Sequence, residues 1–136
     1  MKNVFGEPLK SCCESPITGF FRDGFCRTNR SDFGKHIICA VVDDEFLAFS
    51  KSKGNDLISP QKQYFFPGLK SGDRWCLCIL RWKEALEAGC APKVELESTN
   101  EAALEYVSID DLIKRNLAEK PNFIKIDTEG AEIKVL

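Results

Sequence analysis

Thiols are the side chains in this sequence that are best suited to chemistry, and two of them stand close enough to act together. Cys76 and Cys78 are two residues apart in an apolar run, where a strand points both to one face about 7 Å apart. The cysteines that the fold could bring near this pair are Cys12, Cys13, Cys26 and Cys39. Thiols so arranged can hold zinc or another soft metal, or act as nucleophiles. Our candidate thiols are Cys26, Cys39, Cys76 and Cys78.

The same cysteines also have a simpler interpretation. The sequence has no C-x-x-C pair, the spacing on which strong structural zinc signatures rely. A reduced cysteine in an apolar strand usually packs as a small hydrophobic residue. Core packing is therefore favoured over metal binding, and we predict neither a resident metal nor a cofactor.

The cysteine count and the N-terminal sequence bear on the redox state. The chain has seven cysteines, an odd number, and it begins with "MKNVFGEPLKSCC", which has no apolar core of signal-peptide length. The longest apolar run, from Ile37 to Val42, is too short to cross a bilayer. We therefore expect a soluble cytoplasmic protein whose cysteines stay reduced.

His36 is the single histidine of the sequence and stands three residues before Cys39, just ahead of a predicted strand. An imidazole can serve as a general base or, together with Cys39, as a metal ligand. A histidine at a junction between loop and strand is more often a simple hydrogen-bonding residue. Acyl-transfer chemistry would require it to meet a thiol such as Cys26 or Cys76.

Six polar residues form a second candidate constellation, because each flanks a glycine-containing turn and an aromatic or apolar segment. A shared cleft at one end of the sheet could bind a small anionic or polar ligand through them. The alternative is that they hydrogen-bond backbone amides in their own turns. The residues are Arg22, Asp23, Asn55, Asp56, Asp73 and Arg74.

Composition excludes several classes of protein. A chain of 136 residues fits one domain of ordinary size. With 19 basic and 21 acidic side chains, it has neither the charge excess of a disordered segment nor a strongly basic surface for nucleic acid. We predict a small molecule or a protein as partner, with no nucleic acid and no membrane.

The elements that position these residues suggest an α+β fold. Residues 1–35 are rich in glycine, proline and phenylalanine and predict a loop-rich wrap over a sheet. Ile37–Val42 and Phe46–Lys51 predict an antiparallel hairpin, and Arg74–Leu80, apolar on both faces, predicts a central strand. Strands and helices do not alternate strictly, so we expect a two-layer sandwich with a small, mainly antiparallel sheet and short helices.

Helix and strand signals follow in the second half. "RWKEALEAG", residues 81–89, predicts a helix that buries Trp82, Ala85 and Leu86 and ends at Gly89. A short strand is expected over Lys93–Glu97. Ser108 and Asp111 form a variant capping box that starts a further helix, with Ile109, Leu112 and Ile113 on its apolar face. Trp75 and Trp82 both stand within apolar runs and are expected to anchor the core.

Four separated blocks, in order, resemble an uncharacterised and largely bacterial family known as domain of unknown function 2237. They are "PITGFFRDGFC", "EFLAFSKSKGNDL", "FPGLKSGDRWCLCILRW" and "AALEYVSIDDL", and the resemblance covers residues 3–115. It implies a compact two-layer α+β domain with no established activity, substrate or cofactor. Members of that family often carry paired cysteines where this chain has Phe25 and Cys26, and a histidine where it has Asn100.

The C-terminal stretch resembles a different family. "PNFIKIDTEGAEIKVL", within residues 108–136, is similar to an interior block of FkbM-type S-adenosylmethionine-dependent methyltransferases. That resemblance makes Asp127 and Glu129 candidates for substrate or metal contacts, although they also suit the start of a short helix. The upstream sequence has no glycine-rich loop for the cofactor. We therefore divide the chain into a domain at 1–115 and a partial methyltransferase-like strand and helix at 116–136.

Three functional hypotheses follow. The first is a small-ligand or protein-binding module without a catalytic signature, which leaves an enzymatic role open but disfavoured. The second is a metal-binding protein or enzyme that uses the candidate thiols. The third is a fragment of a methyltransferase fusion that is inactive as it stands.

Overall fold

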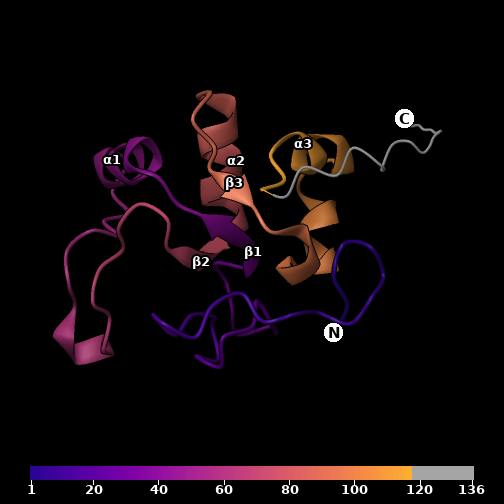
Figure 1. Cartoon of the computed structure of the whole chain (residues 1–136), viewed down its shortest axis with the longest axis horizontal. Helices are drawn as coiled ribbons and strands as arrows, with labels where there is room; N and C mark the ends of the chain where they lie inside the picture. The colour runs from indigo at the N-terminus through magenta and orange to yellow at the C-terminus, as the bar shows by residue number, and fades with distance from the viewer. Residues whose placement is uncertain (118–136) are drawn as a thin grey trace.

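The computed structural model describes residues 1–117 of the chain. Within that range three strands and three α-helices alternate with 3₁₀ turns (Figure 1). They are β1 (His36–Val41), α1 (Asp44–Ser52), η1 (Lys62–Tyr64), β2 (Arg74–Cys78), α2 (Ile79–Glu87), β3 (Lys93–Val94), η2 (Leu96–Ser98), η3 (Glu101–Glu105) and α3 (Ile109–Lys114). The predicted α+β class, with a small antiparallel sheet and short helices, is confirmed.

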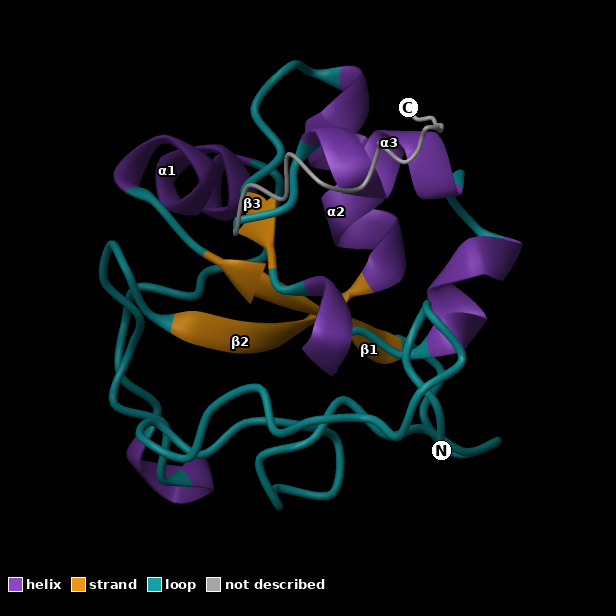
Figure 2. Cartoon of the chain, turned by 45° about the vertical axis from the view of Figure 1, so that its right-hand side comes forward, coloured by secondary structure: helices purple, strands orange, loops and turns teal. Residues whose placement is uncertain are grey.

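The sheet has the order β2-β1-β3, and both pairings are antiparallel. Helices α1, α2 and α3 lie on one side of it, and the loops of the N-terminal segment lie on the other (Figure 2). The prediction that residues 74–80 form the central strand is wrong, because β1 is central. Cys76 and Leu77 are buried although β2 is an edge strand, and the N–H of Cys76 donates to the hydroxyl of Thr18 at 2.8 Å.

The predicted hairpin is also wrong, because Phe46–Lys51 belongs to helix α1. The acidic stretch "DDE" marks the start of the helix instead of a turn between strands. Asp43 is the N-cap, and its carboxylate accepts a hydrogen bond from the N–H of Phe46 at 2.8 Å. Phe46, Leu47 and Ser50 are then buried together on the face toward the core.

The predicted helix over residues 81–89 is present as α2, which begins two residues earlier. Trp82 is fully buried, and its indole N–H donates to the carbonyl of Pro92 at 3.1 Å. Gly89 follows the helix at φ 81°, in the left-handed region that glycine adopts without strain. Trp82 is therefore the core anchor that the sequence predicted.

The last described helix starts as predicted, and the strand before it is shorter than predicted. The hydroxyl of Ser108 accepts from the N–H of Asp111 at 3.1 Å, which caps α3. Leu112 is buried, whereas Ile109 and Ile113 remain 36% and 40% exposed. β3 ends at Val94 because the chain turns into η2 directly afterwards.

The wrap predicted for residues 1–35 contains no helix or strand among those named above, and two disulfides join it to the sheet. Cys12 is bonded to Cys39 of β1, and Cys26 is bonded to Cys76 of β2. The expectation that the cysteines stay reduced is therefore wrong for these four. Their partners are 27 and 50 residues apart in sequence, so their proximity is created by the fold.

No helix within residues 1–117 combines the length and the apolar character needed to cross a bilayer.

The burial of Trp82 predicts a large effect of truncation. We expect Trp82→Ala to lower the free energy of unfolding by about 3–5 kcal/mol, since it leaves a cavity and orphans the carbonyl of Pro92. Leu80→Ala, on the same helix at a side chain 57% exposed, should change it by less than about 0.5 kcal/mol. Urea unfolding followed by circular dichroism measures both, and equal effects would contradict this assignment of the core.

Candidate functional site

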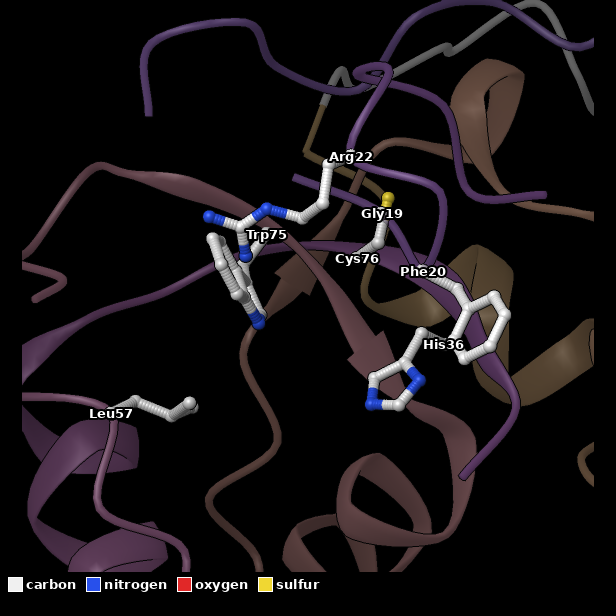
Figure 3. A pocket seen from close by; sticks show the side chains of 7 residues that line it. All are labelled: Gly19, Phe20, Arg22, His36, Leu57, Trp75 and Cys76. Carbon is white, nitrogen blue, oxygen red and sulfur yellow. The ribbon is translucent and has the colours of Figure 1, made fainter. Parts of the chain in front are cut away.

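Two neighbouring hollows of about 290 and 210 Å³ share a wall made by His36, Leu57 and Trp75. We call the two together the Trp75 groove. Gly19, Phe20 and Arg22 border one end, and the side chains that border that hollow are drawn in Figure 3. Asn55, Cys78 and Arg81 border the other end. The groove therefore brings together the wrap, the first two strands, the loop after α1 and the start of α2.

Arg22 covers part of the indole of Trp75. Its guanidinium carbon lies 5.7 Å from the ring centroid, a cation–π arrangement (Figure 3). Nη2 of Arg22 also donates to the carbonyl of Tyr64 at 3.2 Å. Trp75 is also in edge contact with Phe66, at 5.0 Å between centroids. Trp75 thus packs against the core as predicted while part of it borders the groove.

Arg81 supplies a second cation at the other end. Its Nη1 donates to the carbonyl of Lys53 at 3.1 Å and lies 3.4 Å from a carboxylate oxygen of Glu84. Among the described residues that line the Trp75 groove there is no aspartate or glutamate. The groove therefore combines two guanidinium groups, one of them paired with Glu84, with an aromatic wall.

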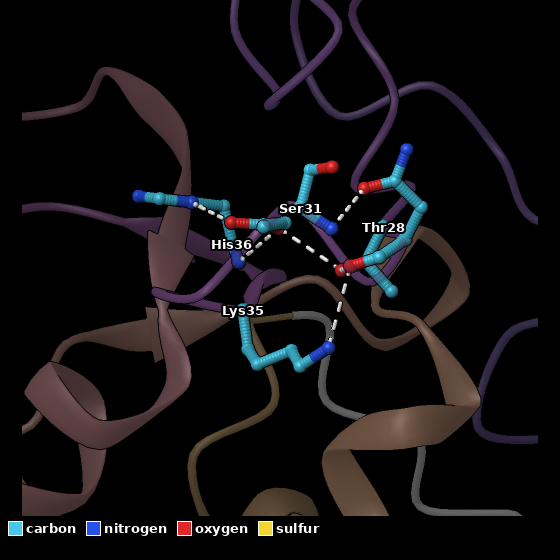
Figure 4. Close-up of polar contacts among 6 residues, drawn as sticks. Thr28, Ser31, Lys35 and His36 are labelled. Atoms are coloured by element: carbon cyan, nitrogen blue, oxygen red, sulfur yellow. Dashed lines mark hydrogen bonds and ion pairs between the residues drawn. The ribbon is translucent and has the colours of Figure 1, made fainter.

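His36 is held by a buried carboxylate. Its Nδ1 lies 2.7 Å from Oδ1 of Asp32, and its backbone N–H donates to Oδ2 at 2.9 Å (Figure 4). The hydroxyl of Thr28 also donates to Oδ2, at 3.0 Å. Pairing with a carboxylate favours the proton on Nδ1, so Nε2 is the nitrogen free to accept a proton or a ligand.

Neighbours restrict the ring of His36 further. It stacks on Phe20 with 6.5 Å between ring centroids and an interplanar angle of 18°. A Cβ atom added to Gly34 would lie only 2.7 Å from Cε1 of His36. Gly34 therefore leaves the space that this orientation of the ring requires.

The carboxyl of Asp32 is fully buried, and burial by itself raises its pKa. Hydrogen bonds from the backbone and ring of His36 and from Thr28 outweigh that effect, so the pKa lies below the ordinary value. Asp32 thus stays ionised at neutral pH and orients the imidazole.

The free thiol of Cys78 borders the same hollow as His36. The two residues are direct partners in the β1–β2 ladder. The histidine therefore meets a different cysteine from the partners considered above, because Cys26 and Cys76 are bonded to each other. A thiol and an imidazole therefore border one hollow, and the imidazole is held by the carboxylate of Asp32.

The other candidate thiols belong to a buried cysteine cluster, which we define as Cys12, Cys26, Cys39 and Cys76. Each is 4% exposed or less. The Sγ atoms of Cys12, Cys26 and Cys39 all lie within 4.8 Å of one another. Asn100 is buried beside this cluster and donates to the carbonyl of Cys26 at 3.1 Å.

The six residues of the predicted cleft do not converge. Arg22 and Asn55 border opposite ends of the Trp75 groove. Asp73 borders a separate hollow beside Pro67 and Gly68 and accepts from the N–H of Lys70 at 3.0 Å.

The remaining three residues are engaged by partners outside the groove. Asp23 pairs with Arg27 at 2.6 Å, and Arg74 pairs with Glu95 at 3.2 Å. The carboxylate of Asp56 accepts from the N–H groups of Ile58 and Ser59, and hydrogen bonds from Ser59 and then Ile58 lower its pKa. Asp56, and Asp23 through the N–H of Phe25, thus make the turn contacts of the simpler interpretation, whereas Arg74 makes an ion pair instead.

Sequence reasoning missed Arg81 as a groove residue and Cys12 as a member of the cluster. In the sequence, Arg81 is typical of the polar face of a helix, and no local pattern indicates that it lines a groove. Glycine directly before "KH" was an available signal, since Gly34 makes room for the ring of His36. The methyltransferase-like residues Asp127 and Glu129, with the strand and helix predicted around them, lie outside the described residues.

The lowered pKa of Asp32 predicts a dependence of stability on acid pH. Its contribution should be fully present above the unfolded-state value of about 3.8 and should be lost as the pH falls through the lower folded-state value. Asp32→Asn should cost about 1–3 kcal/mol at pH 7, and the gap to the wild type should narrow on acidification. Urea unfolding between pH 7 and pH 2 measures this, and a gap that stays constant would contradict it.

Comparison with known proteins identifies the family of the chain. No curated protein matches the chain. The model of the family described as "Uncharacterized protein conserved in bacteria (DUF2237)" matches residues 2–116, which include both the Trp75 groove and the cysteine cluster. The chain therefore belongs to this uncharacterised bacterial family.

Proposed function

We propose that the domain binds a small anionic ligand with a planar apolar part in the Trp75 groove. The observation that carries this proposal is the placement of Arg22 and Arg81 at opposite ends of a wall formed by His36, Leu57 and Trp75. Guanidinium groups recognise carboxylates and phosphates through paired, charge-assisted hydrogen bonds. Leu57 and the exposed part of Trp75 supply apolar contact for the remainder of the ligand.

A protein partner is the alternative within the same hypothesis. It would depend on exposed rings such as those of Phe33 and Phe65, which are 92% and 88% exposed. These rings belong to separate loops, and neither borders the groove. A hollow that has a cation at each end and an aromatic wall between them favours a small molecule.

Phenyl phosphate is a suitable probe, because it carries both an anion and a flat ring. Trp82 is buried, so a change in tryptophan emission on titration reports on Trp75. We expect saturable binding that Arg22→Gln and Arg81→Gln each weaken about tenfold, the effect of losing one charge-assisted contact. Arg30→Gln, an exposed arginine away from the groove, is the matched control and should bind as the wild type does.

Phenol and inorganic phosphate, titrated separately, distinguish the two parts of the site. Each should bind more weakly than phenyl phosphate. Equal binding in the Arg22, Arg81 and Arg30 variants would sink the proposal, provided that urea unfolding shows all three to be folded.

A thiol-dependent enzyme is a second candidate, supported by the placement of Cys78 opposite His36. In this scheme Nε2 of His36 accepts the proton of the Cys78 thiol, and Asp32 stabilises the imidazolium. The thiolate then adds to a carbonyl carbon of the ligand, the electrons of the C=O π bond move to its oxygen, and the imidazolium returns its proton to that oxygen. Cys78 thereby replaces Cys26, Cys39 and Cys76 as the reactive member of the predicted thiol set.

Alkylation under native conditions tests the second candidate. Cys78 should react with iodoacetamide faster than Cys13, and His36→Gln should slow that reaction while leaving Cys13 unchanged. Burial, with a contribution from Glu45 and Asp43, raises the pKa of the Cys90 thiol, so Cys90 should react slowest at neutral pH. Peptide mapping by mass spectrometry gives the three rates, and equal rates for Cys78 and Cys13 would exclude activation by His36.

The domain division at residue 115, the cytoplasmic location and the methyltransferase-like tail stay predictions. The family match ends at residue 116, next to the proposed boundary.

A further inference from the structure

The cysteine cluster draws its members from three parts of the described chain. Cys12 and Cys26 come from the wrap, Cys39 from β1 and Cys76 from β2. The four form a buried group of their own beside the main hydrophobic core. Because Cys76 is bonded to Cys26, its sulfur adjoins the three that lie within 4.8 Å of one another. Four sulfur atoms are thus gathered in one place.

The backbone around these sulfurs is fixed by hydrogen bonds that do not depend on the disulfides. Cys39 and Cys76 face each other across the β1–β2 ladder. The N–H of Cys39 donates to the hydroxyl of Thr99 at 3.2 Å, and that of Cys76 donates to the hydroxyl of Thr18. Both bonds point away from the partner strand. The pair is therefore of the non-hydrogen-bonded type, in which opposite side chains are closest.

The wrap cysteines are held in the same way. The N–H of Cys12 donates to the carbonyl of Gly24 at 2.7 Å, and the carbonyl of Cys26 accepts from Asn100. The backbone N–H of Lys10 donates to the carbonyl of Glu97 at 3.1 Å, so the segment before Cys12 is bonded to η2. Reduction of the disulfides therefore leaves contacts that keep all four sulfurs facing one point.

We propose that, in the reduced protein, Cys12, Cys26, Cys39 and Cys76 bind one zinc ion as a tetrathiolate site. Tetrahedral zinc with Zn–S bonds of about 2.3 Å places its sulfurs about 3.8 Å apart. That separation lies within the 4.8 Å that already encloses three of the sulfurs. The proposed site requires the two S–S pairs to open to this distance after reduction. The cluster then has two states, one with two disulfides and one with a single metal centre. Both states attach the wrap to the sheet.

The conversion balances with a dithiol as reductant. Each disulfide accepts two electrons and two protons from one dithiol, which closes to its own disulfide, so two dithiols release four cysteine thiols. Zinc then replaces the four thiol protons, and a centre with a net charge of −2 is formed. The positive charge of the metal offsets the cost of burying four thiolates. When no metal is bound, burial favours the neutral, protonated thiols.

Cobalt provides a spectroscopic probe of the proposed site. The full chain is reduced with dithiothreitol, exchanged into reductant-free anaerobic buffer and titrated with Co²⁺. We expect one equivalent to bind with the intense visible bands of tetrahedral cobalt thiolate, and Zn²⁺ to abolish those bands. The oxidised protein should bind none, because its four sulfurs have no thiolate to offer.

Variants separate the cluster from the other cysteines. Cys39→Ser and Cys76→Ser should each lose the stoichiometric cobalt spectrum, whereas Cys13→Ser, Cys78→Ser and Cys90→Ser should keep it. Since a cluster variant can fail to fold, the wild type is also alkylated with and without zinc. Zinc should protect the four cluster cysteines, and none of the other three, from iodoacetamide.

Two results would overturn the proposal. One is a reduced wild type that stays folded and takes up no cobalt or zinc. The other is metal uptake that persists in the Cys39→Ser/Cys76→Ser double variant or protects cysteines outside the cluster. If reduction alone unfolds the chain, zinc should restore its circular dichroism, and failure to do so counts equally against the site.

Discussion

Both candidate sites depend on the register between β1 and β2. That register sets His36 opposite Cys78 at one end of the ladder and Cys39 opposite Cys76 nearer its middle. Side chains alternate between the two faces of a strand, so a slip of one residue would move each pair to the wrong face. An irregularity in the ladder between His36 and Ile38 lies next to the first pair. The same pairing therefore aligns an imidazole with a free thiol and brings together the sheet half of the cysteine cluster.

The wrap completes both sites from outside the sheet. It supplies Arg22 and Phe20 to the groove, and Cys12 and Cys26 to the cluster. Cys76 belongs to the cluster and also borders the groove, so the two sites are adjacent in the fold. Because the wrap has few backbone hydrogen bonds of the helix or sheet kind, its attachment to the sheet is what positions its side chains. Any change in that attachment is expected to move the side chains that the wrap supplies to the groove.

The groove and the cluster also differ in kind. The groove is open, and its lining includes two arginines, an imidazole and an indole. The cluster is closed, and its chemistry is limited to what four sulfur atoms allow. Asp32 belongs to the groove side of this division. Its buried carboxylate holds both the imidazole of His36 and the backbone at the start of β1.

The sequence by itself determined the elements whose signals are local. The fold class, the buried face around Trp82, the glycine after α2 and the Ser108 cap all depend on residues within one or two turns of each other. The acidic stretch before Phe46 was ambiguous between a turn and an N-cap, and burial of Phe46 and Leu47 against the core decided for a helix. Turn residues such as Asp56 satisfy their own backbone, so their polarity gave no information about a shared cleft. Only the tertiary structure decided that Arg22 meets Trp75, that His36 meets Cys78 and that four cysteines share one place. The physical reason is that these contacts join residues tens of positions apart, which no periodicity or spacing encodes.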